Sequence, residues 1–162
     1  MTPQKIRLLI VDDEVRFIEA LSRRLGLRDF EVTAVTSGKQ ALKTAEEQPF
    51  DLALVDLKMP EMSGEQLLEV LKQRDPDIEV VMLTGHGSID SAVRCTKLGA
   101  FGYLAKPCET DELMKTLRDA YQKHVESKVR EDVERMEELG RIAIEQSPLA
   151  ALRRLRGLEK DR

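Results

Sequence analysis

Charged and hydroxyl side chains stand at the ends of four short apolar runs in this sequence. Asp12 and Asp13 follow the first run, and Asp56 follows the third. Thr84 and Lys106 stand at the ends of the last two runs. In open sheets of parallel strands, ligands bind beyond the carboxyl ends of the strands. If the runs are neighbouring parallel strands, these five side chains lie together at one edge of the sheet.

Such a group of side chains could hold a metal ion and a phosphoryl group. Three carboxylates at one edge repel one another unless a cation lies among them. A set of oxygen ligands with few protein donors suits Mg²⁺, which keeps several of its waters. The metal, Lys106, and Thr84 with backbone N–H groups could each take one phosphoryl oxygen. A carboxylate can also be the nucleophile that forms an aspartyl phosphate.

Each of these residues also has a simpler interpretation when it is considered alone. Asp12 and Asp13 could cap a helix, and Thr84 could be an N-cap. Lys106 could be a solvated surface charge. Asp56 is harder to explain in this way, because an acid that ends the apolar run 52–55 is costly to bury without a partner. The joint placement of the residues favours the phosphate site.

The elements that must position these residues alternate along the first 121 residues. Five apolar runs of strand length are near-continuous, as is typical of strands that are covered on both faces. The runs are 8–11, 32–35, 52–55, 78–83 and 101–104. Between them, apolar residues recur every three or four positions, so each intervening segment is predicted to be a helix with one apolar face. These faces are Ile18, Leu21 and Leu25; Ala41, Leu42 and Ala45; Leu67, Leu68 and Leu71; and Ile89, Ala92, Val93 and Thr96.

The alternation of strands and helices with short connections predicts a fold class. Parallel strands joined by right-handed helical crossovers give an α/β, doubly wound sheet with helices on both faces. Other phosphate chemistries on such sheets lack their motifs here. The sequence has no GxxxxGK[ST] and no GxGxxG after the first strand, which excludes a P-loop site and a dinucleotide site.

Composition narrows the class of protein further. The chain has 162 residues, of which 35% are charged, a net charge of −4, and no apolar run approaching a membrane span of about 20 residues. The first residues place acids where a signal peptide needs small side chains, so we expect a cytoplasmic protein without a membrane partner. The acidic balance argues against a nucleic-acid partner. Cys95 and Cys108 lack zinc spacing and are taken as free thiols.

Four segments carry a specific family resemblance. VDDE at 11–14, DLALVDLKMPEMSG at 51–64, VVMLTGHG at 80–87 and GAFGYLAKP at 99–107 closely resemble the receiver domain of bacterial two-component response regulators. The match covers about residues 5–121. The resemblance implies a flavodoxin-like, five-stranded parallel sheet, a role as a phosphoacceptor signalling domain rather than a turnover enzyme, and a sensor histidine kinase or phosphotransfer protein as partner.

The resemblance also implies a role for individual residues. Asp56 would be the phosphoacceptor. Asp12 and Asp13 would hold Mg²⁺ together with Asp56 and the main-chain carbonyl of Lys58. Lys106 would be the phosphate partner, with a cis bond to Pro107.

A second group of residues would transmit the signal and set its lifetime. Thr84 and Tyr103 are the implied switch residues, acting on a face formed by the fourth helix, fifth strand and fifth helix. Lys58 and His86 occupy the two positions that tune phosphate lifetime in the family. Neither side chain would readily orient an attacking water, so we predict self-hydrolysis over minutes or longer. His124 is expected to be a surface residue.

Residues 122–162 form a helical extension of the receiver domain, which we assign to 1–121. The extension has ten basic and nine acidic side chains, against a net charge of −5 for 1–121. The fifth helix is predicted to continue to about Gly140, and Ser147 and Pro148 are the N-cap and first residue of a last helix. That helix carries Leu149, Leu152, Leu155 and Leu158.

An apolar stripe along the extension indicates how the receiver domain could pass on its signal. Tyr121, Val125, Val129, Val133 and Met136 lie on one side of the predicted helix and need a cover. We expect a homodimer through this helix, with output by protein contact and no DNA-binding domain. Two alternatives are a piece of a longer transcriptional activator, with the extension as a dimeric linker helix, and a phosphorelay carrier.

Overall fold

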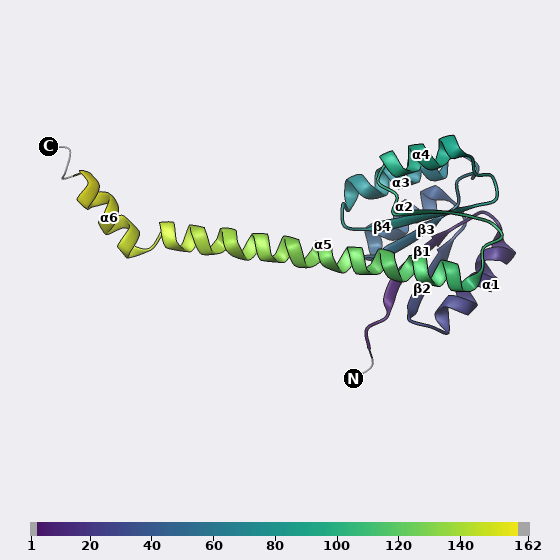
Figure 1. The fold of residues 1–162 in the computed structure, drawn as a ribbon, viewed down its shortest axis with the longest axis horizontal. Helices are drawn as coiled ribbons and strands as arrows, with labels where there is room; N and C mark the ends of the chain where they lie inside the picture. Colours follow the sequence, from purple (N-terminus) through teal and green to yellow (C-terminus); the bar gives the residue numbers. More distant parts are fainter. Residues whose placement is uncertain (1–2, 159–162) are drawn as a thin grey trace. The chain divides into compact units, whose positions relative to one another are not determined.

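The computed structural model describes residues 3–158, which form five strands and six helices (Figure 1). The strands are β1 (Ile6–Val11), β2 (Phe30–Val35), β3 (Leu52–Val55), β4 (Glu79–Thr84) and β5 (Gly102–Ala105). The helices are α1 (Val15–Gly26), α2 (Gly38–Glu47), α3 (Gly64–Arg74), α4 (Ile89–Lys97), α5 (Thr110–Glu145) and α6 (Pro148–Leu158). All five predicted strands are present, although β1 and β2 each begin two residues before the apolar run that predicted them.

The sheet has the strand order β2-β1-β3-β4-β5, and every neighbouring pair is parallel. Val11 pairs with Val55, and Val55 pairs with Met82. At the far side Thr84 pairs with Ala105. This register places the carboxyl ends of β1, β3, β4 and β5 at one edge, as the sequence predicts.

Two apolar clusters cover the two faces of the sheet, which confirms the doubly wound class. One cluster joins alternate residues of the strands to α1 and α5. The other joins the remaining strand residues to α2, α3 and α4. All four residues of β3 are buried. A near-continuous apolar sequence is therefore required in this central strand, because neither of its faces meets water.

The apolar face predicted for α4 is wrong. Its buried side chains are Ser91 and Cys95, whereas Ile89 is 84% exposed and Val93 is also exposed. The periodicity rule assigned Ser91 to the solvent side because its side chain is polar. In the structure its hydroxyl has partners inside the domain, and the apolar side of α4 faces outward.

The helix α5 is longer than predicted, whereas α6 has its predicted start. The helix α5 passes through Gly140 and ends at Glu145, since one glycine in an exposed helix costs only about 1 kcal/mol and does not end it. The helix α6 begins at Pro148, and Ser147 Oγ accepts the N–H of Ala150 at 3.2 Å, which confirms the predicted N-cap. The side chain of Leu158 and residues 159–162 lie outside the described part. No helix within 3–158 is long and apolar enough to cross a membrane.

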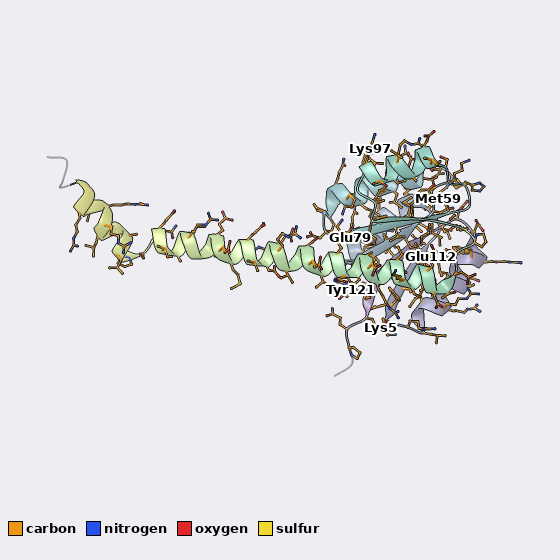
Figure 2. All side chains as sticks on the ribbon, viewed as in Figure 1. Lys5, Met59, Glu79, Lys97, Glu112 and Tyr121 are labelled. Carbon is orange, nitrogen blue, oxygen red and sulfur yellow. The ribbon has the colours of Figure 1, made fainter. Side chains whose placement is uncertain are left out.

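The described part of the chain divides into two compact units, with the boundary between Val125 and Glu126. In the second unit, Figure 2 shows side chains around the whole circumference of α5. The large apolar ones are exposed, as expected for an uncovered stripe. On α5 they are Val129, Val133, Met136, Leu139, Ile142 and Ile144, and on α6 they are Leu149, Leu152 and Leu155.

The prediction that His124 is a surface residue is wrong, because this side chain is buried. Its Nδ1 lies 2.7 Å from the carbonyl oxygen of Asp77, and its Nε2 lies 3.1 Å from Oδ1 of Asp51. The two ring nitrogens of His124 therefore each lie within hydrogen-bond distance of an oxygen atom of another segment. His124 continues the buried face Leu113, Leu117 and Ala120 at spacings of three and four residues. That spacing in the sequence could have identified it.

Asp51 is the centre of this buried polar cluster at the amino-terminal edge of the sheet. Its carboxylate accepts the N–H of Arg7 at 2.8 Å, and Arg7 Nη2 donates to Oδ1 at 2.6 Å. Burial alone would raise the pKa of Asp51, but hydrogen bonds from His124 and Arg7 outweigh it and hold the pKa well below its usual range. The charged form of Asp51 therefore stabilises the fold.

We expect Asp51→Asn to lower the free energy of unfolding by about 3 kcal/mol at neutral pH, because it leaves Arg7 and His124 without their anion. A carboxyl whose folded pKa is depressed stabilises the protein above its unfolded pKa and loses that effect as pH falls. The difference between variant and wild type should therefore shrink below about pH 4. Urea unfolding from pH 7 to pH 2 measures it. Asp29→Asn is the control, because within residues 3–158 the Asp29 carboxylate pairs only with exposed Arg118, at 3.4 Å. Equal losses in both variants would contradict this role.

Candidate functional site

The structure brings the three predicted aspartates together. Asp12 and Asp13 follow β1, and Asp56 follows β3, the neighbouring strand. The N–H of Asp56 donates to the carbonyl of Val11 at 2.9 Å, which ties the end of one strand to the other. One carboxylate oxygen from each aspartate lies within 4.8 Å of the others. Asp12 and Asp56 are buried, whereas Asp13 is exposed.

The donor set fits a divalent cation. Oδ1 of Asp56 is buried and has no hydrogen-bond partner among residues 3–158, and the side chain is only 4% exposed. Burial raises the pKa of Asp56, and the charge of Asp12 raises it further, while Lys106 and Thr84 act in the opposite direction. A buried acid with an unpaired oxygen beside two more carboxylates is suited to a hard cation such as Mg²⁺.

Lys106 faces the same group of acids from the end of β5. Its Nζ lies 2.5 Å from Oδ2 of Asp12 and 3.3 Å from Oε1 of Glu14. The ammonium also lies 4.2 Å from the centre of the Phe17 ring, within cation–π range. Burial lowers the pKa of Lys106, but the hydrogen bond and charge of Asp12 outweigh it, so the pKa is raised. The bond from Lys106 to Pro107 is cis, as expected.

Glu14 and Phe17 are contacts of Lys106 that the sequence did not identify. Glu14 stands beside the aspartate pair in VDDE, so its position could have suggested this contact. Phe17 has no such motif, and its position three residues further along, in the first turn of α1, places its ring under the ammonium. Both contacts attract the Lys106 ammonium and favour its position at the edge of the sheet where the three aspartates lie.

Thr84 is buried at the end of β4. Its Oγ1 accepts the N–H of His86 at 3.1 Å, and α4 is capped instead by Ser88. The interpretation of Thr84 as a helix N-cap is therefore wrong. His86 and Lys58 are both exposed beside the site, in the loops after β4 and β3.

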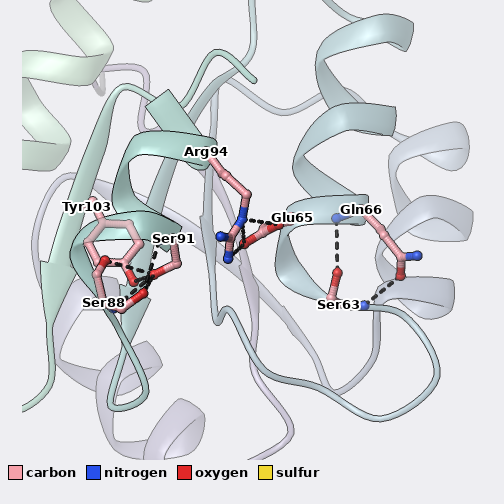
Figure 3. Close-up of polar contacts among 7 residues, drawn as sticks. All are labelled: Ser63, Glu65, Gln66, Ser88, Ser91, Arg94 and Tyr103. Carbon is pink, nitrogen blue, oxygen red and sulfur yellow. Dashed lines mark hydrogen bonds and ion pairs between the residues drawn. The ribbon is translucent and has the colours of Figure 1, made fainter. Parts of the chain in front are cut away.

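Tyr103 lies on β5 with its hydroxyl directed at α4 (Figure 3). Its hydroxyl oxygen lies 2.6 Å from Oγ of Ser91, and its half-buried ring packs against the cluster that includes α3 and α4. A half-buried aromatic residue with a water-exposed hydroxyl was the simpler alternative for this position. The short contact to a buried serine excludes that alternative.

The loop after β3 fixes the backbone at Asp56. A Cβ on Gly64 would lie 2.1 Å from the carbonyl oxygen of Asp56, so only glycine fits there. The N–H of Gly64 donates to the carbonyl of Leu57 at 2.7 Å. Ser63 and Gln66 form a capping box that starts α3 at this point, as Figure 3 shows. Gly64 belongs to a matched motif, but its contact with the backbone of Asp56 was not predicted.

Comparison with known proteins identifies the class. A family model, the response regulator receiver domain, matches residues 8–118. The chain belongs to this family. Receiver domains are the phosphoacceptor signalling domains of two-component systems, and the resemblance inferred from the four sequence segments is therefore confirmed.

Similar proteins carry the receiver domain within longer chains. The transcriptional regulatory protein ZraR of Escherichia coli K12 is 39% identical over 120 residues, covering 74% of this chain and 27% of that protein. The acid tolerance regulatory protein ActR of Rhizobium meliloti is 37% identical over 110 residues, covering 68% and 57%. A receiver domain structure from Clostridium thermocellum has a TM-score of 0.70 at 32% identity, covering 73% and 95%. The chain thus spans about a quarter of the length of ZraR.

We expect Asp56→Asn to stabilise the metal-free protein by about 1–3 kcal/mol, because it removes one of two buried like charges. The same variant should lose the stabilisation by Mg²⁺, which reaches about 2.7 kcal/mol at a hundredfold excess over the Kd. Thermal unfolding with EDTA and with Mg²⁺ measures both effects. Asp119→Asn, an exposed acid on α5, is the control for loss of a charge. A variant that Mg²⁺ stabilises as strongly as wild type would rule out Asp56 as a ligand.

Proposed function

We propose that this receiver domain accepts a phosphoryl group on Asp56 from a histidine kinase or a phosphotransfer protein in the cytoplasm. The observation that carries the proposal is the buried Asp56, with an unpartnered oxygen, between two further aspartates and near Lys106. Asp12, Asp13, Asp56 and the main-chain carbonyl of Lys58 would hold Mg²⁺.

In the transfer, the bond from phosphorus to the donor imidazole nitrogen breaks, and a bond from phosphorus to a carboxylate oxygen of Asp56 forms. Bound Mg²⁺ supplies positive charge for the equatorial oxygens. Lys106 supplies the second positive charge, and its ammonium already lies at the acidic edge, 2.5 Å from Asp12. The domain thereby assists its own phosphorylation, and the same groups assist the later attack of water.

The response to phosphorylation would pass through Thr84 and Tyr103. The Thr84 hydroxyl already lies near Asp56. After phosphorylation, it could donate a hydrogen bond to one of the new phosphoryl oxygens. Movement there would reach Tyr103 on β5, the strand that pairs with β4. The exposed Ile89 and Val93 on α4 provide an apolar surface beside β5 for a partner. We propose this α4–β5–α5 face as the output surface.

The extension would assemble two copies of the chain. Its apolar stripe is exposed, and charges of both signs flank it, as in helices that pair. Similarity to ZraR, a transcriptional regulatory protein, favours a second candidate, in which the chain is the receiver portion of a transcriptional activator and the extension is the dimeric linker helix. Both candidates use the same pairing.

Phosphorylation tests the proposal directly. With Mg²⁺ and acetyl phosphate as donor, intact-mass measurement should show one phosphoryl group per chain, and none for Asp56→Asn. The modified form should decay over minutes or longer, because neither Lys58 nor His86 readily orients an attacking water. Asp90→Asn, which changes an exposed acid of α4, should be modified like wild type. Modification of Asp56→Asn, or a lifetime of a few seconds, would contradict the corresponding part of the proposal.

Light scattering tests the assembly. We expect the full chain to have the mass of a dimer, and the double variant Val133→Glu with Met136→Glu to be a monomer, because two charges on the stripe would be buried unpaired. Arg130→Gln with Arg135→Gln makes the same change in net charge away from the stripe and should stay dimeric. The measurement is repeated with beryllofluoride, a mimic of the phosphoryl group on an aspartate. If wild type is monomeric both with and without it, the pairing proposal fails.

A further inference from the structure

The aromatic ring of Phe17 lies under the ammonium of Lys106. The distance from Nζ to the ring centre is 4.2 Å, which is within cation–π range. Phe17 is the third residue of α1, is half-buried, and packs against the apolar cluster that α1 and α5 form with the sheet. An aliphatic side chain would also fill that place in the cluster. Packing alone therefore does not explain a ring face turned to a cation.

Lys106 reaches its side-chain contacts from the other side of the sheet. It follows β5, whereas Asp12, Glu14 and Phe17 follow β1, and the strands β3 and β4 lie between β1 and β5. The N–H of Lys106 donates to the carbonyl of Thr84 at 2.9 Å, which ties the main chain of the lysine to the end of β4. Its side chain is only 13% exposed. The position of the ammonium is therefore set by the contacts that the segment after β1 offers.

The ion pair between Lys106 and Asp12 depends on what else binds Asp12. Oδ2 of Asp12 accepts from the ammonium at 2.5 Å, and Oδ1 accepts the N–H of Glu14 at 2.9 Å, so both oxygens are in use. Asp12 is also one of the three aspartates proposed to hold Mg²⁺. A divalent cation on Asp12 would lie close to the ammonium and repel it. The ion pair is therefore weakened in the metal-bound site, where Lys106 is needed.

The other two side-chain contacts of Lys106 differ in what they supply. Oε1 of Glu14 lies 3.3 Å from Nζ, but the Glu14 side chain is 62% exposed, and an exposed ion pair contributes little. The Phe17 ring attracts the ammonium through its electron-rich face and uses no carboxylate oxygen. Among the side-chain contacts of Lys106 within residues 3–158, the ring is therefore the one that can hold the ammonium without competing with a metal ion.

We propose that Phe17 is a positioning residue, whose ring keeps the Lys106 ammonium at the phosphorylation site while Mg²⁺ is bound. The proposal rests on the function proposed above and adds a residue of α1 to the side chains that serve Asp56. The direction of the effect follows from the place of the ring. It holds the ammonium beside Asp12, and the carboxylates of Asp12 and Asp56 belong to one group. Loss of the ring face should therefore weaken the binding of an anion at the phosphoryl position.

The test measures the affinity for beryllofluoride, with Mg²⁺ present, by isothermal titration calorimetry on the full chain. We expect Phe17→Leu, which keeps an apolar side chain but removes the ring, to weaken binding about fivefold, the scale of one cation–π contact. Phe17→Tyr keeps the ring face and should bind as tightly as wild type. Phe101→Leu is the matched control, because Phe101 also packs against the core and lies under a lysine, Lys123, at 5.8 Å. That pair is at the opposite end of β5 and should not affect binding.

Two further variants separate positioning from packing. A trifluorinated phenylalanine at Phe17 keeps the shape of the ring but removes most of the negative charge of its face, so it should weaken binding as Phe17→Leu does. The same replacement at Phe101 should have no effect. In a Lys106→Gln background, Phe17→Leu should weaken binding no further, because the ring acts through the ammonium. The fluorinated variant also keeps the test valid if Phe17→Leu fails to fold.

Nuclear magnetic resonance tests the metal-bound state without a phosphoryl mimic. Protons above an aromatic ring resonate upfield, so the ε-methylene signal of Lys106 reports its contact with Phe17. The signal is identified by its loss in Lys106→Arg. We expect an upfield position in EDTA that persists when Mg²⁺ is added, and an ordinary position in Phe17→Leu. If Mg²⁺ returns the wild-type signal to its ordinary position, the lysine leaves the ring on metal binding and the proposal is overturned.

The outcomes distinguish this proposal from the function on which it rests. If wild type fails to bind beryllofluoride, or if Asp56→Asn binds it equally well, the proposed function is wrong. If wild type binds through Asp56 but the fluorinated Phe17 variant binds as tightly as wild type, the role of the ring is wrong and the function stands. An equal loss from Phe17→Leu in the Lys106→Gln background would show that the ring serves packing alone. Tighter binding in the Phe17 variants would show that the ring holds the lysine away from the phosphoryl position.

Discussion

Two buried carboxylates on adjacent strands, Asp12 and Asp56, impose the constraint on which the rest of this domain depends. Because β1 and β3 are adjacent and parallel, both acids lie at the same edge of the sheet, and the strand pairing keeps them close together. Repulsion between them must be offset by positive charge. Lys106 provides part of that charge from the end of β5, and a divalent cation bound among the aspartates would provide the rest. Binding of a cation at this site would relieve the repulsion and so stabilise the folded domain.

The position of the site could be predicted because it follows from the order and length of the apolar runs in the sequence. Near-continuous apolar runs specify strands covered on both faces, and parallel strands bring their carboxyl ends to one edge. The residue after each run therefore has a defined place before any contact is known. Asp12, Asp56, Thr84 and Lys106 all lie where this rule puts them. The residue types also indicated a cation and phosphoryl site, whereas the assignment of Asp56 as the phosphoacceptor came from the family resemblance.

The errors occurred where a polar residue is buried for a tertiary reason. Ser91 and His124 each stand on the covered side of a helix, and a rule that assigns polar side chains to solvent places both outside. Their partners, Tyr103 and Asp51, are distant in sequence. For His124, the spacing of the preceding apolar residues on α5 contained the correct answer. For Ser91, the apolar residues of α4 pointed to the wrong face, because that face is exposed.

The place of each functional strand in the sheet has a consequence for local opening. Asp12 and Asp56 follow β1 and β3, which have a neighbour on either side, whereas Tyr103 and Lys106 belong to β5 or its end, at the edge of the sheet. Edge strands exchange their amide hydrogens through smaller openings than central strands, because fewer contacts must be broken. The residues proposed as nucleophile and metal ligands therefore follow the strands that open least. The tyrosine and lysine that are proposed to respond to a phosphoryl group belong to an edge strand or its end, where local opening leaves the rest of the sheet folded.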